Sequence, residues 1–348
     1  KSMQIRRVKL LEVVIMLLAT LGFWLDNVLL LMFVLFLLGL QSTIFGPIKY
    51  GILPRILKRE ELVGGNALIE MGTFVAILGG TIAGPQLAGI DVSWPYWASV
   101  SCLAVAVTGY LFSLKIPPSP AVAPDLEISW NIFTETARNM RFINQNRTVL
   151  NSVLGISWFW FFGAIFLVQI PSYTQNVLGG DKHLMSALLA LFIIGISTGS
   201  LLCERLSGKQ VEIGLVPFGA IGLTLFGLDL YFASPETPTA GITVLEFLSG
   251  GHNWRIIIDL LLIGTFGGFY IVPLYALVQS RSEQDHLSRV IAGLNILNSL
   301  FMVVAAVAAM LILGPAGLSI PELFLISAVL NAVVAIYIFT LVPEFLMR

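Results

Sequence analysis

Two charged side chains stand at the edges of long apolar segments. Lys49 follows the apolar run 28–48, and Glu70 lies near the start of the run 66–90. Charged groups at membrane depth are costly and mark a functional site by default. Both residues lie near the same ends of successive runs, so they can pair with each other when the site is empty. The alternative is that Lys49 reaches the water interface and Glu70 caps a helix.

Amide side chains inside the apolar runs form a second set of candidates. Such side chains often only bridge neighbouring helices, contributing about 0.6 kcal/mol each. The set comprises Gln41, Asn66, Gln86, Gln169, Gln279, Asn295, Asn298 and Asn331. Arg255 and Asp259, near the end of another run, have the four-residue spacing of a structural helical ion pair.

The apolar runs that carry these residues define the class of protein. Of 348 residues, 57% are hydrophobic and 11% charged, against about 25% charged in ordinary soluble domains. Runs of about 20 apolar residues span a membrane as helices, which satisfy their own backbone hydrogen bonds. The sequence therefore predicts an all-α membrane protein with ten spans, at about 8–25, 28–48, 66–90, 95–114, 149–171, 185–204, 212–232, 255–279, 289–313 and 321–342.

The placement of basic residues predicts the orientation of the spans. Of the 19 Lys and Arg residues, 17 fall on one side of this arrangement, and only Lys182 and Arg255 fall on the other. Basic residues are enriched in cytoplasmic loops. We therefore expect a multi-pass protein with both ends of the chain in the cytoplasm.

The longest cytoplasmic connection predicts the domain organisation. It begins with several prolines and continues with Trp130, Phe133, Ala137 and Met140 at helical spacing, which indicates an amphipathic helix on the membrane surface. We expect the remainder of an N-terminal bundle with four spans at 1–114, a cytoplasmic linker at 115–148 and a C-terminal bundle with six spans at 149–348. A six-helix first bundle would place two further spans upstream.

Several function classes are not expected. The histidines and aspartates lie at helix ends or in loops, whereas intramembrane proteases need catalytic or zinc-binding groups on facing helices. The two cysteines, Cys102 and Cys203, give no disulfide or metal framework. The net charge of −1 argues against a nucleic-acid partner. We expect neither an enzyme nor a bound metal or cofactor.

Two glycine-containing patterns resemble motifs of the major facilitator superfamily. The first, at Gly80, Gly84 and Pro85, resembles the fifth-helix signature of its drug:proton antiporters; tight helix packing is the alternative to a hinge. The second resembles a cytoplasmic loop motif whose ion pair latches one conformation, although here its basic residues would also satisfy the positive-inside rule. This second pattern comprises Gly199, Glu204, Arg205, Gly208 and Lys209.

Two longer segments, 49–84 and 267–298, resemble the bacterial lysophospholipid transporters, a branch of the same superfamily. The resemblance implies a two-bundle fold with ten of its twelve transmembrane helices present. It also implies transport of lysophospholipids across the bacterial inner membrane to the cytoplasmic leaflet for re-acylation, by alternating access. The substrate-binding residues implied are Lys49, Glu70, Asn66, Gln279, Asn295 and Asn298.

The final segment, PEFLMR at 343–348, resembles the junction of fused proteins in which the transporter continues into an acyltransferase and an acyl-ACP synthetase. The expected partners are therefore the lysophospholipid, membrane lipids and these enzymes, in cis or in trans. Two alternatives remain open. One is a drug or metabolite efflux antiporter driven by protons, and the other is a membrane scaffold that docks a soluble acyltransferase.

Overall fold

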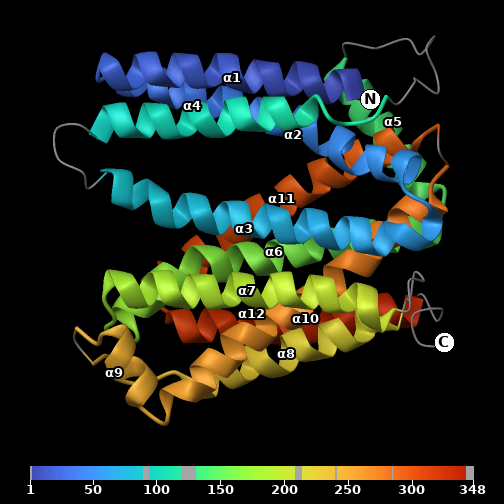
Figure 1. Cartoon of the computed structure of the whole chain (residues 1–348). Helices are drawn as coiled ribbons and strands as arrows, with labels where there is room; N and C mark the ends of the chain where they lie inside the picture. Colours follow the sequence, from blue (N-terminus) through green and yellow to red (C-terminus); the bar gives the residue numbers. More distant parts are fainter. Residues whose placement is uncertain are drawn as a thin grey trace. The chain divides into compact units, whose positions relative to one another are not determined.

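The computed structural model describes residues 2–88, 94–118, 131–207, 214–239, 241–283 and 285–341, which are mainly helical (Figure 1). It confirms the all-α fold and the ten predicted long helices. These are α1 (Ser2–Trp24), α2 (Val28–Ile56), α3 (Leu62–Ala88), α4 (Trp94–Ser113), α6 (Arg147–Asn176), α7 (Lys182–Leu206), α8 (Leu215–Ala233), α10 (Asn253–Arg281), α11 (Leu287–Leu313) and α12 (Ile320–Leu341). The shorter elements are η1 (Arg59–Glu61), α5 (Ile132–Asn144) and α9 (Val244–Ser249).

The long helices have the dimensions of membrane spans. Within the described ranges, nine of them are long and apolar enough to cross a bilayer, and α1 is the long helix outside this set. The charged residues Arg6, Arg7, Lys9 and Glu12 gather in the first half of α1 and lower its apolar content. The chain is therefore a multi-pass membrane protein.

The described chain divides into two compact units. Unit 1 comprises Lys1–Lys58, Gly79–Phe142 and Glu283–Asn295, and unit 2 comprises Arg59–Leu78, Ile143–Ser282 and Ile296–Arg348. Neither unit is continuous in sequence, because α3 and α11 each contribute to both. The domain boundaries expected at 1–114, 115–148 and 149–348 stay a prediction.

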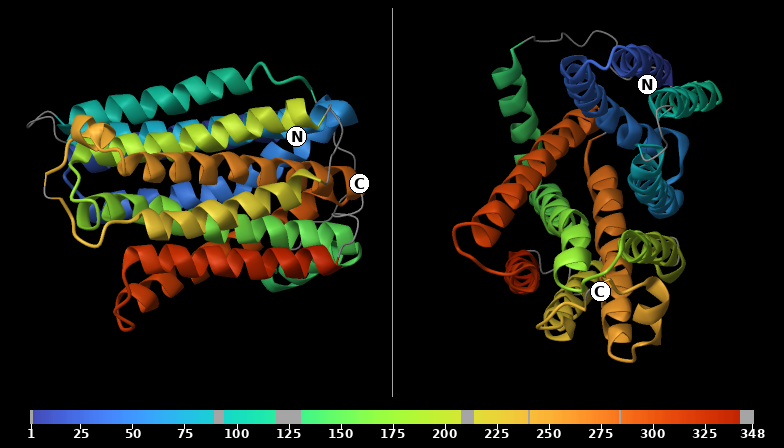
Figure 2. Two further views of the ribbon diagram at one scale, coloured as in Figure 1. Left: turned by 90° about the horizontal axis from the view of Figure 1, so that it is seen from below. Right: turned by 90° about the vertical axis from the view of Figure 1, so that its left-hand side faces the viewer.

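Unit 2 is organised around α10. This helix packs against α6, α7 and α8, while α12 packs against α6 and α8, and Figure 2 shows α7, α8 and α10 running alongside one another. Every residue of α10 from Gly267 to Gln279 is buried. A helix that is apolar on all faces occupies the centre of a bundle, so α10 forms the core of this unit.

Glycines bring the backbones of α7 and α10 into contact. Gly195 and Gly199 on α7 face Gly264 and Gly268 on α10, with four-residue spacing on both helices. A Cβ atom added to Gly195 would lie 3.1 Å from Cα of Gly264, and one added to Gly268 would lie 2.6 Å from the backbone carbonyl carbon of Gly199. Association between helices in lipid depends on such close packing.

Unit 1 contains α1 packed against α2 and α4. Ile15, Ala19 and Val34 form a buried apolar cluster between α1 and α2. Beside it, Gln41 Nε2 donates to Glu12 Oε2 at 3.0 Å, and the same carboxylate pairs with Lys9 Nζ at 2.8 Å. Gln41 therefore links two helices, the ordinary role of an amide in a span.

A capping box begins the short helix α9. The backbone N–H and the hydroxyl of Thr243 both donate to Glu246 Oε2, at 2.9 and 2.8 Å. These two hydrogen bonds, the backbone bond first, lower the pKa of Glu246. The cap satisfies a donor that the first turn of a helix otherwise leaves open.

The glycine contact predicts the effect of one added methyl group. In Gly268→Ala, Cβ would overlap the backbone of α7, and overpacking of this kind typically costs about 1–3 kcal/mol. The melting temperature of the purified protein in detergent should fall. The matched control is Gly163→Ala on α6, because a Cβ there meets no described atom within 4 Å. Equal melting temperatures for the two variants would contradict the packing.

Candidate functional site

Two of the candidate residues form a reciprocal amide pair in unit 2. Asn66 Nδ2 on α3 donates to Gln279 Oε1 on α10 at 2.7 Å, and Gln279 Nε2 donates to Asn66 Oδ1 at 3.0 Å. Asn66 Nδ2 also donates to the Leu62 carbonyl oxygen at 2.8 Å. The exposed fractions are 0% for Asn66 and 2% for Gln279. The pair therefore joins residues that lie 213 positions apart in the chain.

Glu70 lies on the same face of α3 as Asn66, one turn further along, because residues four apart share a helix face. Its side chain is fully buried. One more turn along is Phe74, whose ring stacks on Trp160 of α6 with centroids 6.1 Å apart. Trp160 Nε1 in turn donates to the Tyr275 hydroxyl on α10 at 3.4 Å. This face of α3 thus changes from polar at Asn66 to aromatic at Phe74.

The aromatic cluster of Phe74, Phe159, Trp160 and Tyr275 was not among the sequence candidates. Phe159 meets Phe74 edge to face, with ring centroids 6.5 Å apart. One sequence feature could have pointed to Phe74. The i, i+4, i+8 spacing of Asn66, Glu70 and Phe74 places this aromatic residue on the same helix face as two candidate residues. The partners on α6 and α10 could be found only from the fold.

Asn298 makes a separate contact in unit 2. Ser157 Oγ on α6 donates to Asn298 Oδ1 on α11 at 2.9 Å, and both side chains are buried. The structure therefore places Asn66, Gln279, Glu70 and Asn298 in one unit, although Asn298 has a different partner from the amide pair.

Lys49 and Asn295 belong to unit 1. Lys49 is half-buried in the second half of α2, which continues to Ile56, with Nζ 4.6 Å from the centroid of the Tyr50 ring. Asn295 on α11 lies against Gly46 of α2, where an added Cβ would be 3.3 Å from Cγ of Asn295. Since Lys49 and Glu70 lie in different units, their pairing stays a prediction.

The described latch candidates Gly199, Glu204 and Arg205 have different surroundings, and their role as a latch stays a prediction. Gly199 belongs to the contact between α7 and α10 described above. The Glu204 carboxylate lies at the first turn of α3, where a Cβ on Gly64 would be 2.6 Å from its Cδ. An anion is favoured at that position by the helix dipole. Arg205 is exposed, and Gly208 and Lys209 lie outside the described residues.

The glycine pattern of α3 lies in its second half. A Cβ added to Gly80 or Gly84 would meet no heavy atom of the described chain within 4 Å, and Pro85 lies within the helix. Unlike Gly195 and Gly268, Gly80 and Gly84 make no close helix contact among the described residues. A packing or hinge role for Gly80, Gly84 and Pro85 stays a prediction.

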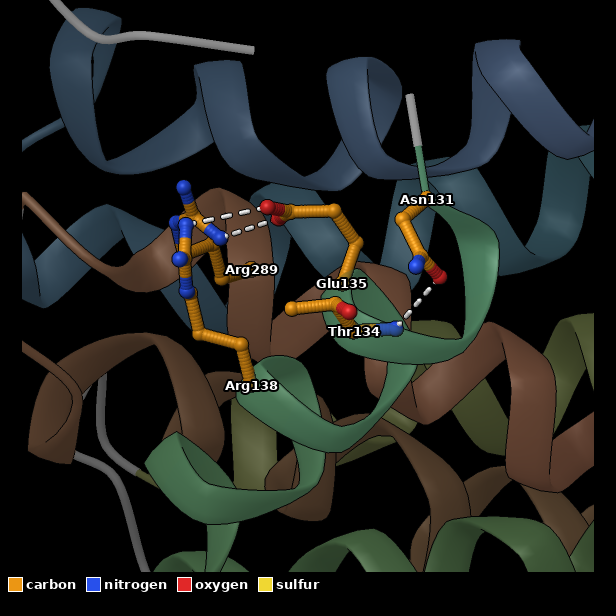
Figure 3. A network of polar contacts seen from close by, with 5 residues as sticks. All are labelled: Asn131, Thr134, Glu135, Arg138 and Arg289. Carbon is orange, nitrogen blue, oxygen red and sulfur yellow. Dashed lines mark hydrogen bonds and ion pairs between the residues drawn. The ribbon is translucent and has the colours of Figure 1, made fainter. Parts of the chain in front are cut away.

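A polar network holds α5 against the start of α11 in unit 1 (Figure 3). The two oxygens of Glu135 accept from different arginines, Oε2 from Arg289 Nη1 at 2.5 Å and Oε1 from Arg138 Nη1 at 2.9 Å. The Phe142 ring also stacks on His286, with centroids 4.1 Å apart. The amphipathic pattern predicted this helix but not its ionic contact with α11.

The expected ion pair between Arg255 and Asp259 is corrected by the structure. Arg255 instead forms a bidentate pair with Asp229 of α8, through Nε to Oδ2 at 2.8 Å and through Nη2 to Oδ1. The four-residue spacing indicated the wrong partner for Arg255. The facing helix α8 places a carboxylate where it accepts two hydrogen bonds from the planar guanidinium group. Among the described residues, no group of three His, Cys, Asp or Glu could hold a metal ion.

These features define a helical, multi-pass membrane protein, and similarity to known proteins identifies its family. The sequence profile of the Major Facilitator Superfamily matches residues 5–254. The chain therefore belongs to the major facilitator superfamily.

Within that superfamily, the chain is similar to curated relatives named "Lysophospholipid transporter LplT". It is 29% identical to the relative from Serratia proteamaculans over 257 residues, covering 72% of this chain and 58% of the relative. It is 30% identical to that from Cronobacter sakazakii over 255 residues, with the same two coverages. The chain thus spans a little over half the length of these relatives. The resemblance drawn from segments 49–84 and 267–298 is confirmed.

The solved structures show the same fold. The superfamily transporter FucP, in the outward conformation, matches with a TM-score of 0.67 at 14% identity. The match covers 98% of this chain and 83% of FucP. A bacterial homologue of the iron transporter ferroportin matches with a TM-score of 0.62 at 12% identity, covering 99% of this chain and 83% of that one.

The amide pair predicts a non-additive effect on stability. Gln279→Leu should lower stability by about 1–3 kcal/mol, because it leaves the buried Asn66 amide without its partner on α10. The double variant Asn66→Leu/Gln279→Leu should recover much of that loss, since both polar groups are then removed together. Thermal unfolding in detergent of the two single variants and the double variant measures the coupling. Additive losses would contradict a direct bond.

Proposed function

We propose that this chain is the membrane domain of a lysophospholipid transporter of the bacterial inner membrane, which moves its substrate to the cytoplasmic leaflet for re-acylation. The observation that carries the proposal is the change from polar to aromatic side chains along one face of α3. Glu70, buried between Asn66 and Phe74, separates an amide pair from an aromatic cluster. Eight residues of helix extend about 12 Å, a length that accommodates a headgroup at one end and the start of an acyl chain at the other.

Each candidate residue suits one part of such a substrate. Lys49 offers a cation for the phosphate, and Glu70 offers a carboxylate for an amine in the headgroup. The amides Asn66, Gln279, Asn295 and Asn298 supply donors and acceptors that turn toward the headgroup as helices move. The aromatic rings of Phe74 and Trp160 provide apolar surface for the acyl chain.

Alternating access between two bundles is the mechanism that we propose for the transfer. The positive-inside asymmetry supports an orientation with both ends of the chain in the cytoplasm. In that orientation, substrate released on the cytoplasmic side would be available to an acyltransferase, fused to this chain or separate from it. The curated relatives named as lysophospholipid transporters support the same substrate class.

The Glu204 contact supports a cytoplasmic latch between α7 and α3. We expect Gly64→Ala to displace the carboxylate and remove a dipole interaction of about 0.3–1 kcal/mol. In the Gly64→Ala background, the further change Glu204→Gln should then have little additional effect on the melting temperature. Gly72→Ala on the same helix is the control, since a Cβ there meets no described atom within 4 Å. A full Glu204→Gln effect in both backgrounds would refute the contact.

The substrate assignment is tested by following labelled lysophosphatidylethanolamine in membrane vesicles that contain the full-length parent protein. Lys49→Ala should reduce its movement by about 10- to 100-fold, because a charge-assisted hydrogen bond contributes about 1.5–3 kcal/mol. Membrane insertion should be unchanged. Inverted and right-side-out vesicles together give the direction of movement.

Lys58→Ala is the matched control, because Lys58 is an exposed lysine beyond the end of the same helix. It should transport normally. Normal movement in Lys49→Ala would refute the site. No movement in the unsubstituted protein, together with dye export under a proton gradient, would instead identify an efflux antiporter.

A further inference from the structure

A buried carboxyl group lies beneath the ion pair that links α8 and α10. Asp229 near the end of α8 and Arg255 near the start of α10 form the bidentate pair described above, with side chains 39% and 44% exposed. Asp259 follows Arg255 by one helical turn and is only 1% exposed. The helices α8 and α10 lie side by side (Figure 1), so the ion pair is the more exposed layer of this contact and Asp259 the deeper one.

Among the described residues, Asp259 interacts with a cation, a second carboxyl group and a phenol. Its own helix contributes Arg255, α8 contributes Asp229 and α6 contributes the phenol of Tyr173. The Tyr173 hydroxyl is hydrogen-bonded to Ser234 Oγ at 2.8 Å. The titratable side chains at this end of the neighbouring helices α7 and α9 include Asp181, Lys182, His183 and Glu246.

The hydrogen bonding of Asp259 is incomplete. Its Oδ2 atom is buried and has no donor among the described residues. Its carboxyl group interacts with that of Asp229 on the facing helix α8. Two ionised carboxylates are acceptors only, so neither can donate to the other unless one carries a proton.

Charge balance also indicates that one of the two carboxyl groups carries a proton. A buried charge needs a partner, and the guanidinium of Arg255, which is the cation next to Asp259 among the described residues, is already held by both oxygens of Asp229. Two like charges that share a site cannot both ionise at low cost. We propose that Asp259 is a proton-binding site, and that its proton forms the hydrogen bond to Asp229 that completes the contact between α8 and α10.

Proton binding gives this end of unit 2 a dependence on pH. With the proton in place, Asp259 donates to Asp229, and Asp229 remains paired with Arg255. Removal of the proton leaves two carboxylates, Asp229 and Asp259, beside one guanidinium. The two carboxylates then repel each other across the contact between α8 and α10. The substrate assignment is not needed for this inference, because the readouts below do not involve transport.

Infrared difference spectroscopy of the purified full-length protein tests the site directly. A protonated carboxyl group has a C=O stretch that ionised carboxylates lack, and this band shifts when the proton is exchanged for deuterium. We expect such a band at neutral pH and its loss in Asp259→Asn, whose side chain has nearly the same shape as a protonated aspartate. Glu70→Gln is the control, because Glu70 is the other fully buried carboxyl residue considered above, and this variant should retain the band.

Three infrared results would overturn the proposal. They are the absence of any protonated carboxyl band in the unsubstituted protein, persistence of the band in Asp259→Asn, and its loss in Glu70→Gln alone. The unsubstituted protein remains informative if Asp259→Asn fails to fold. In that case a band that shifts in deuterium oxide and disappears as pH rises supports a buried protonated carboxyl, and its absence refutes one.

A second readout is the pH dependence of thermal stability in detergent. If the folded protein holds a proton that the unfolded chain releases, stability falls as pH rises through the range in which the folded site loses it. This part of the decline should be missing in Asp259→Asn. Parallel curves for the two proteins would overturn the proposal.

Discussion

The backbone contact between α7 and α10 is the constraint on which the rest of unit 2 depends. Lipid provides no hydrophobic force that pulls one apolar helix toward another, so association depends on close packing. Gly195, Gly199, Gly264 and Gly268 remove the side chains that would keep the two backbones apart. With α7 in place, α10 is covered on its remaining sides by α6 and α8, and its buried polar residues are held at fixed positions.

Polar groups inside this bundle are hydrogen-bonded to polar groups on other helices. Asn66 and Gln279 satisfy each other, and Ser157 donates to Asn298. Because each such bond contributes only about 0.6 kcal/mol in a membrane, these pairs can be exchanged for a ligand at low cost. Glu70 lies on α3, one helical turn from Asn66. Weak, exchangeable polar contacts of this kind are compatible with the substrate site that we propose.

Ionic contacts act mainly where helices end. Glu204 lies at the first turn of α3, Glu135 joins α5 to α11, and Asp229 joins α8 to Arg255 at the start of α10. Charge is less costly near the water interface than at the centre of a bilayer. These contacts therefore fix helix ends and leave the helix centres to apolar and amide packing. Asp259 departs from this pattern, because it is a buried carboxyl group and not part of an exposed ion pair.

The sequence by itself determined the ten long helices. A segment in lipid must satisfy its own backbone hydrogen bonds, so each long apolar run in the sequence predicts a helix without knowledge of its neighbours. It also indicated Asn66, Glu70, Gln279 and Asn298, although not their partners. Only the tertiary structure decided that Arg255 pairs with Asp229 and not with Asp259, and that the glycines of α7 and α10 form a close backbone contact. Spacing along one helix fixes which residues share a face, but partners on other helices depend on how the chain packs in three dimensions.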